Sequence, residues 1–260
     1  MNSLFKMRRV TKEFGGLKAV SDFSITIERG ELVGLIGPNG AGKTTVFNMI
    51  TGRLRPTTGV ITWKGKDITR LPAHLITAGG IARTFQNIKL FGDMSVLEIV
   101  MVSFHFSIGS CFLSAMLGLP KHRREEKRIR EQSIAYLEEA GLGGLSFEKA
   151  RNLPYGLQRK LEITRALATG PDLLLLDEPA AGMNPMEKIE LAAFVTQVRE
   201  GRGIAILLIE HDMKFVMSIC ERIKVMDYGL SIAEGSPGEI RSNPEVIRAY
   251  LGGPGDDTSG

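Results

Sequence analysis

Residues 37–45, GPNGAGKTT, carry the clearest chemistry in this chain. They have the form G-x-x-x-x-G-K-S/T and follow the strand-like run ELVGLI. Glycines let a backbone wrap closely around phosphate oxygens, with its N–H groups pointing inward at the start of a helix. Lys43 adds positive charge for the terminal phosphates, and the Thr44 hydroxyl can ligate Mg²⁺. The predicted phosphate-binding residues are Gly37, Pro38, Asn39, Gly40, Ala41, Gly42, Lys43, Thr44 and Thr45.

Two adjacent carboxylates, Asp177 and Glu178, follow the apolar run LLLL. Such a run is typical of a strand buried on both faces of a parallel sheet, and parallel sheets present ligands at the carboxyl ends of their strands. Asp177 is therefore placed to hold Mg²⁺, while Glu178 is placed to polarise an attacking water. Together with Lys43, these carboxylates predict an enzyme that binds a magnesium nucleotide.

The segments that position these residues alternate between strand and helix patterns. Residues 4–70 contain short β-like runs separated by turns, whereas 90–144 has helical periodicity. The runs PDLLLLDEP and GIAILLIEH each follow a helical segment, which is typical of a parallel α/β sheet. Two further strands joined by a tight turn and a closing helix complete the chain. The pattern predicts an α/β core interrupted by a helical insertion.

Composition sets broad limits on the class of protein. The 260 residues are 43% hydrophobic and 24% charged, as in a soluble globular domain, and a net charge of +4 suits nucleotides, nucleic acid or a membrane surface. Cys111 and Cys220 show no paired spacing, which favours a reducing compartment. The first residues show no secretory signal, so we expect the protein in the cytosol.

Residues 99–120 contain no Asp, Glu, Lys or Arg and are long enough to suggest a membrane span. Four serines, two glycines and a histidine dilute this apolar character. A single crossing would also place the two halves of one site on opposite sides of the bilayer. We therefore predict packed helices, with either a protein partner or an internal core covering their apolar faces.

The order and spacing of these motifs resemble the ATP-binding subunits of ABC transporters over nearly the whole chain. Phe14, 29 residues before Lys43, matches the aromatic residue that stacks on adenine in that family. Gln86 in ARTFQN matches the glutamine that reaches Mg²⁺ and the attacking water. His211 in LLIEHD matches the histidine that contacts the γ-phosphate. A core phenylalanine, an ordinary glutamine and a structural histidine are the alternatives.

The same resemblance gives a role to LPYGL at 153–157, which stands where the family has Leu-Ser-Gly-Gly-Gln. This signature motif begins a helix whose N-terminus points at the γ-phosphate held by a second subunit. The resemblance thereby assigns Tyr155 and Gly156 to nucleotide binding across the interface. Pro154 and Leu157 depart from the usual serine and glutamine. Asn184, in AAGMNP, replaces the usual aspartate of the loop between subunits.

The resemblance implies a P-loop, RecA-like ATPase core with an N-terminal antiparallel β subdomain and an inserted α-helical subdomain. Within one domain, 1–260, the core would comprise 1–90 and 156–260, and the helical subdomain 91–155. The phrases GIARTFQNIKLF and LIEHDMKFVM look like the branched-chain amino-acid importer group. The implied partners are a second ATP-binding subunit, identical or related, integral-membrane permease subunits and, indirectly, a periplasmic binding protein. The chain would lie peripherally on the cytoplasmic face of the inner membrane, with no nucleic-acid partner.

Three other functions fit part of the pattern. An ABC subunit serving another substrate, such as a lipid or polysaccharide exporter, shares every motif. A soluble ABC ATPase of translation or DNA repair usually has two cassettes or a long coiled coil, both absent from this sequence. A P-loop kinase would leave the glutamine, signature and histidine matches as coincidences. The transported substrate and the direction of transport are not fixed by these residues.

Overall fold

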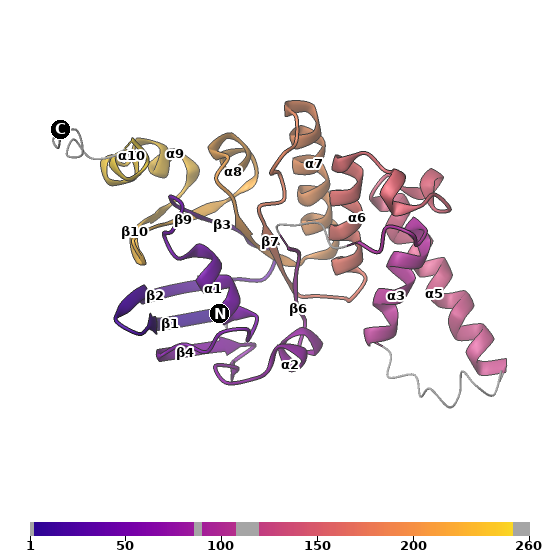
Figure 1. Ribbon diagram of the computed structural model, residues 1–260, viewed down its shortest axis with the longest axis horizontal. Helices are drawn as coiled ribbons and strands as arrows, with labels where there is room; N and C mark the ends of the chain where they lie inside the picture. The colour runs from indigo at the N-terminus through magenta and orange to yellow at the C-terminus, as the bar shows by residue number, and fades with distance from the viewer. Residues whose placement is uncertain (1–2, 86–89, 108–119, 252–260) are drawn as a thin grey trace.

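The computed structural model describes residues 3–85, 90–107 and 120–251. Its strands form two sheets (Figure 1). The smaller sheet is antiparallel with the order β2-β1-β4-β5, and the larger has the order β10-β9-β3-β8-β7-β6. The strands of the smaller sheet are β1 (Phe5–Phe14), β2 (Leu17–Ile27), β4 (Thr58–Trp63) and β5 (Lys66–Asp67).

The larger sheet is parallel from β9 to β6, and β10 joins it antiparallel to β9. β7 and β8 are neighbours although they are far apart in the sequence, so the residues after each strand meet at one edge. The strands are β3 (Leu32–Ile36), β6 (Ile81–Arg83), β7 (Leu173–Asp177), β8 (Ala205–Ile209), β9 (Arg222–Asp227) and β10 (Leu230–Gly235).

The helices differ in their position relative to the sheets. In Figure 1, α3 and α5 lie at the end of the molecule farthest from the C-terminus, and α6 and α7 lie between them and the parallel sheet. The helices are α1 (Lys43–Ile50), α2 (Ala73–Ala78), α3 (Val96–Ser107), α5 (Pro120–Glu139), α6 (Tyr155–Leu167), α7 (Pro185–Arg202), α8 (Met213–Ile219), α9 (Pro237–Ser242) and α10 (Pro244–Leu251). Two 3₁₀ turns are η1 (Gly143–Leu145) and η2 (Ala150–Asn152).

The apolar runs are continuous because the central strands are buried on both faces. Leu174 and Leu176 contribute to a core shared with the helices α3, α5, α6 and α7. Leu173 and Leu175 point the other way, into a core shared with the antiparallel sheet and α1. Alternate side chains of a strand point to opposite faces, so both sets are apolar. Burial of each such side chain is worth roughly 1.5–3 kcal/mol.

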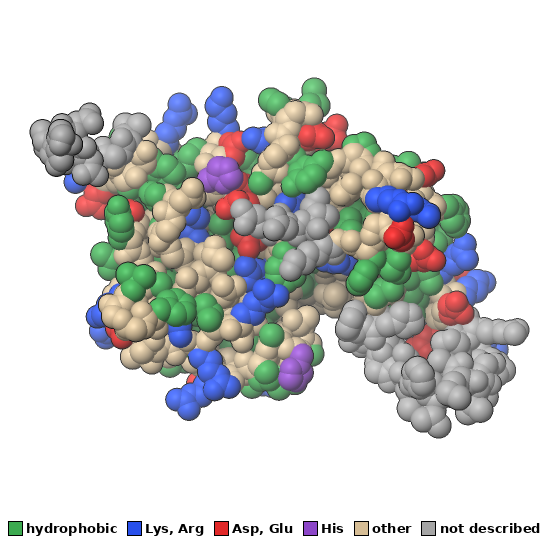
Figure 2. Space-filling model, viewed as in Figure 1, with side chains coloured by type: hydrophobic (Ala, Val, Ile, Leu, Met, Phe, Trp, Pro, Cys, Tyr) green, Lys and Arg blue, Asp and Glu red, His purple; other side chains and the backbone are tan. Residues whose placement is uncertain are grey.

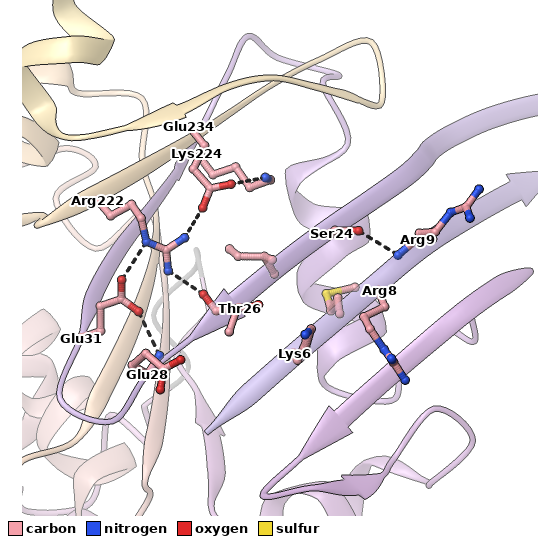
Figure 3. A pocket seen from close by; sticks show the side chains of 12 residues that line it. Lys6, Arg8, Arg9, Ser24, Thr26, Glu28, Glu31, Arg222, Lys224 and Glu234 are labelled. Carbon is pink, nitrogen blue, oxygen red and sulfur yellow. Dashed lines mark hydrogen bonds and ion pairs between the residues drawn. The ribbon is translucent and has the colours of Figure 1, made fainter. Parts of the chain in front are cut away.

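A charged groove of about 660 Å³ lies where the two sheets adjoin (Figure 3). Arg222 on β9 donates to a carboxylate oxygen of Glu31 at 2.8 Å and to the backbone oxygen of Thr26 at 2.5 Å. Glu234 accepts from Arg222 and, at 2.5 Å, from Lys224. These contacts bind β2 to the larger sheet, and both cations are paired with carboxylates. The ion pairs that line the groove therefore join the two sheets.

Among the described residues, no helix is long and apolar enough to cross a membrane. The charge-free segment 99–120 contributes residues to α3 and to the first position of α5, and 108–119 lies outside the described residues. α3 packs against α5, with the rings of Phe104 and Tyr136 meeting edge to face at 5.7 Å between centroids. Cys220 is a buried free thiol, and Cys111 lies outside the described part of the chain.

Candidate functional site

The loop between β3 and α1 accepts only glycine at two of its positions. A Cβ on Gly37 (φ +150°) would lie 2.0 Å from the Met226 carbonyl oxygen, and one on Gly42 (φ +100°) would lie 2.5 Å from the Ala19 oxygen. Gly40 also has a positive φ, +83°, but a Cβ there would meet nothing within 4 Å. Gly37 and Gly42 thus allow the loop to pack closely against the protein, while Gly40 borders open space.

This difference predicts unequal effects of two alanine substitutions. Gly37→Ala should destabilise the protein by about 2–5 kcal/mol, the sum of an unfavourable positive φ and overpacking against backbone. Gly40→Ala should cost only about 1–2 kcal/mol, because only the conformational term applies. Urea unfolding of the two variants measures both. Equal losses would contradict this account of the loop.

α1 begins directly after the loop, and its first turn carries no capping side chain. Its N-cap residue is Gly42, and no acidic residue lies in the first turn. The N–H groups of a first helical turn have no partner inside the helix and carry partial positive charge. Thr44 is exposed and Thr45 is half-buried at this helix end. The loop and helix therefore form a positive, open surface suited to an anion.

Lys43 turns its side chain back over the loop. Its Nζ donates to the backbone oxygens of Gly37 at 2.6 Å and Pro38 at 2.8 Å. Burial lowers the pKa of Lys43, and the negative charges of Glu178 and Asp177 oppose that fall. The ammonium group therefore lies within electrostatic reach of both carboxylates.

Asp177, the last residue of β7, forms a buried ion pair that the sequence analysis missed. Its Oδ2 lies 2.7 Å from Nη2 of Arg83 at the end of β6, and the two side chains are 8% and 6% exposed. Arg83 also donates to Oδ1 of Asn48 on α1 at 2.8 Å. The signal in the sequence was a charged residue at the end of the apolar run GIAR. Arg83 thus orients the carboxylate predicted to bind metal.

Glu178 and His211 meet although they follow different strands. Oε2 of Glu178 lies 3.8 Å from Nδ1 of His211, whose side chain is 58% exposed. Glu178 has a φ of +46°, and its backbone N–H donates to the backbone oxygen of Ile209 at 2.9 Å. Figure 2 shows histidine and acidic side chains at the surface of the molecule. The two side chains lie together because β7 and β8 are adjacent.

The buried side chain of Glu210 bonds to both the loop after β7 and the loop after β8, and the sequence analysis did not identify it. Its side chain is 1% exposed. It accepts hydrogen bonds from the backbone N–H groups of Ala180 at 2.7 Å, His211 at 3.1 Å and Asp212 at 3.5 Å. Burial raises the pKa of Glu210, and these three donors oppose the rise. One carboxylate therefore fixes the loop after β7 against the loop after β8.

The raised pKa of Glu210 predicts a particular pH dependence. The folded protein binds this proton more tightly than the unfolded chain, so the contribution of Glu210 to unfolding free energy is largest below about pH 4.3, the ordinary glutamate pKa. It should fall as pH rises through the folded pKa. Glu210→Gln does not titrate, so urea unfolding should show the stability of the natural protein, relative to this variant, decreasing from pH 4 to pH 7. A constant difference would contradict the assignment.

The predicted signature motif lies at the start of α6. Pro154 is the N-cap residue, and the cap has no side-chain hydrogen bond. Tyr155 is 42% exposed, and Gln158 donates from its amide nitrogen to the Leu153 oxygen at 2.8 Å. A helix start without a capping side chain leaves backbone N–H groups available to an external acceptor. This geometry suits contact with an anion, as the resemblance implies.

Gly156 is buried against α7 of the same chain. A Cβ on Gly156 would lie 3.0 Å from Oε1 of Glu187. The same glutamate and Asn184 form a capping box, in which the Asn184 side chain accepts from the Glu187 N–H at 3.0 Å. Asparagine and aspartate cap helices about equally well, so the departure at Asn184 preserves this structural role. A substitution at Gly156 would disturb α7 as well as any contact with a second subunit.

Phe14 ends β1 with a half-exposed ring, and Nζ of Lys12 lies 4.9 Å from the ring centroid. The following hairpin brings Ala19 against Gly42, so this edge of the antiparallel sheet adjoins the phosphate loop. An accessible aromatic ring at this edge suits stacking. Gln86 lies outside the described residues, so its predicted place beside Mg²⁺ stays a prediction.

Comparison with known proteins identifies the family. A family model described as "ABC transporter" matches residues 20–181. The chain belongs to this family. It is 45% identical to the high-affinity branched-chain amino acid transport ATP-binding protein BraF of Pseudomonas aeruginosa, an alignment covering 96% of this chain and 98% of that protein. LivG of Escherichia coli, with the same description, is 44% identical with the same coverage.

Other comparisons extend this result. A model described as "Branched-chain amino acid ATP-binding cassette transporter" matches residues 232–256 of this ABC protein. The lipopolysaccharide export protein LptB of Haemophilus influenzae is 34% identical, covering 96% of this chain and 98% of its own. A crystal structure of the ADP conformation of an ABC transporter cassette superposes with a TM-score of 0.84 at 32% identity, covering 97% of this chain and 100% of that one. The predicted family and P-loop ATPase fold are confirmed.

Proposed function

We propose that this chain is the ATP-binding and ATP-hydrolysing subunit that energises an importer of branched-chain amino acids. The observation that carries the proposal is the meeting of Lys43, Asp177, Glu178 and His211 at one edge of the parallel sheet. The substrate class is supported by the names of relatives that match along almost the whole chain. The family match to residues 232–256 supports it independently.

In this proposal, ATP phosphates bind the loop 37–45 and the start of α1, and the Phe14 ring stacks on adenine. The available donors suit Mg²⁺, which prefers hard oxygen ligands. The Thr44 hydroxyl and the Asp177 carboxylate would hold it, with Gln86 as the third predicted ligand. Asp177 keeps Oδ1 on the side not paired with Arg83. Mg²⁺ would neutralise charge that develops on the phosphates.

Glu178 would act as the general base that takes a proton from the attacking water. His211, 3.8 Å away, would contact the γ-phosphate and hold its position relative to that base. The positive φ of Glu178 and the three hydrogen bonds of Glu210 fix the two loops that carry these side chains. Such preorganisation is the main way a protein accelerates phosphoryl transfer.

A second ATP-binding subunit, identical or related, would complete the site. The start of α6, with Tyr155 and Gly156, would face the γ-phosphate held by that partner. Without a serine at Pro154, contact would depend on backbone N–H groups and the helix dipole. We place the ATPase core at 1–90 and 156–260 and a helical subdomain at 91–155, whose α3 and α5 would face a membrane permease. The subunit would lie on the cytoplasmic face of the inner membrane, and a periplasmic binding protein would deliver the amino acid.

The lipopolysaccharide export relative makes lipid export the second candidate. Affinity purification of the tagged chain from detergent-solubilised native membranes, followed by mass spectrometry, identifies the associated subunits. The purified complex in proteoliposomes is then tested for ATP-dependent accumulation of labelled leucine, with Glu178→Gln as the inactive control. Accumulation supports the proposal. A complex that extracts lipid and does not accumulate leucine would replace it with the export function.

A further inference from the structure

α6 contains a fully buried ion pair one turn from its start. Nη1 of Arg159 lies 2.7 Å from Oε2 of Glu162, and both side chains are 0% exposed. Burial raises the pKa of Glu162, which Arg159 and the other donors around the carboxylate oppose. Removing two charges from water is costly, and apolar residues of similar volume often replace such pairs without loss of stability. Stability alone therefore does not account for this pair.

The pair binds both backbone polar groups of Phe85, a residue distant from α6 in the sequence. Nη1 of Arg159 donates to the backbone oxygen of Phe85 at 2.7 Å, and the Phe85 N–H donates to Oε1 of Glu162 at 3.2 Å. Phe85 directly precedes Gln86, so the carbonyl that Arg159 binds belongs to the peptide bond joining those two residues. The backbone of Phe85 is thus tied to α6 at two points.

Further contacts connect this junction to the site in both directions. The Phe85 ring lies 4.6 Å from the Arg53 guanidinium and 5.5 Å from that of Arg83, which pairs with Asp177. In the other direction, Nη2 of Arg159 lies 3.4 Å from the Tyr155 hydroxyl at the start of α6. A contiguous series of contacts therefore joins the Asp177 carboxylate to the start of α6.

We propose that the Arg159–Glu162 pair is a positioning device that ties the Phe85–Gln86 peptide to the first turn of α6. The two segments then shift as one unit when nucleotide binds. This inference rests on the proposed function, because it assumes that ATP acts at both segments. The pair acts through Phe85 and α6 and does not itself contact nucleotide.

The test is hydrogen–deuterium exchange of the full-length chain with and without Mg²⁺ and a non-hydrolysable ATP analogue. The double variant Arg159→Met/Glu162→Leu keeps a similar side-chain volume and removes both fully buried charges of the pair together. The matched control is Lys160→Met/Glu190→Leu, which removes an ion pair between Lys160 on α6 and the exposed Glu190 on α7, 3.3 Å apart. Circular dichroism and binding of a fluorescent ATP analogue check that each variant folds and binds nucleotide.

In the natural protein and the control, nucleotide should slow exchange in peptides covering 84–90 and 153–158 together. In the double variant, slowing at 84–90 should decrease by about tenfold, the ratio expected when a charge-assisted hydrogen bond is lost. Slowing at 153–158 should remain. Equal slowing of both peptides in the double variant would overturn the inference.

Glu162→Gln provides a second measurement that does not depend on the folding of the double variant. It keeps the shape of the side chain and an acceptor for the Phe85 N–H, but its amide nitrogen opposes the Arg159 donor. Nucleotide should again slow exchange less at 84–90 than at 153–158. Equal slowing of the two peptides would overturn the inference. If the natural protein binds no ATP analogue, the proposed function itself fails, and the inference fails with it.

Discussion

Replacing Glu178 with glutamine should slow ATP hydrolysis by about 10²–10⁴-fold, the usual contribution of a general base, while MgATP still binds. Glutamine keeps the shape of the side chain at the end of β7 but cannot accept the water proton. The Glu178 carboxylate lies 3.8 Å from His211, the other side chain proposed to act at this site. Phosphate release measures turnover, and size exclusion should show an ATP-stabilised dimer that accumulates because hydrolysis no longer separates it.

Glu190→Gln is the control for this substitution. Glu190 lies on α7, its side chain is 54% exposed, and it pairs with Lys160 at the surface. Its loss should change turnover by less than twofold, since exposed ion pairs are worth about 0–1 kcal/mol. A Glu178→Gln protein that hydrolyses ATP at nearly the natural rate would remove Glu178 from the mechanism.

Replacing Lys43 with alanine should reduce ATPase activity by at least about 10²–10³-fold, the loss typical when one group that stabilises transition-state charge is removed. It should also weaken ATP binding, because an ammonium group beside the terminal phosphates is lost. In the structure this group bonds to the backbone oxygens of Gly37 and Pro38 and is positioned within the loop. Fluorescence titration measures affinity, and phosphate release measures rate.

Lys64→Ala is the control, because it also removes one positive charge from the protein but at a different place. Lys64 pairs with Asp172 at 2.5 Å and is 42% exposed, away from the phosphate loop. The control should bind ATP as the natural protein does. Thermal unfolding of both variants separates a folding defect from a binding defect. Unchanged turnover in a folded Lys43→Ala protein would mean that the nucleotide site lies elsewhere.

Local motifs were predictable because their chemistry depends on neighbouring residues. The sequence predicted a glycine-rich loop between a strand and a helix at 37–45. The structure has such a loop between β3 and α1, with positive φ angles at Gly37 and Gly42. The run LLLL predicted a strand buried on both faces, and β7 confirms it. For Phe14 and His211, only the resemblance to a family indicated roles, since a single aromatic residue or histidine has many uses.

Contacts between distant segments required the tertiary structure. Arg83 and Asp177 are 94 positions apart, and Arg159 and Phe85 are 74 apart. These pairs exist because β6 lies beside β7 in the sheet and α6 packs beside β6, an arrangement that pattern and propensity do not encode. Buried charges cannot be recognised from residue type alone, because the same arginine would be solvated on an exposed helix face.

The sequence by itself determined the phosphate loop, the buried strand before the carboxylates and the α/β class, because each depends on local backbone geometry or the period of apolar residues. The tertiary structure alone decided which groups surround those residues. It brought Glu210 beneath two loops and placed Glu187 against Gly156, where sequence reading expected only a second subunit. The physical reason is that burial and hydrogen bonding are properties of the packed chain, set by which strands and helices become neighbours.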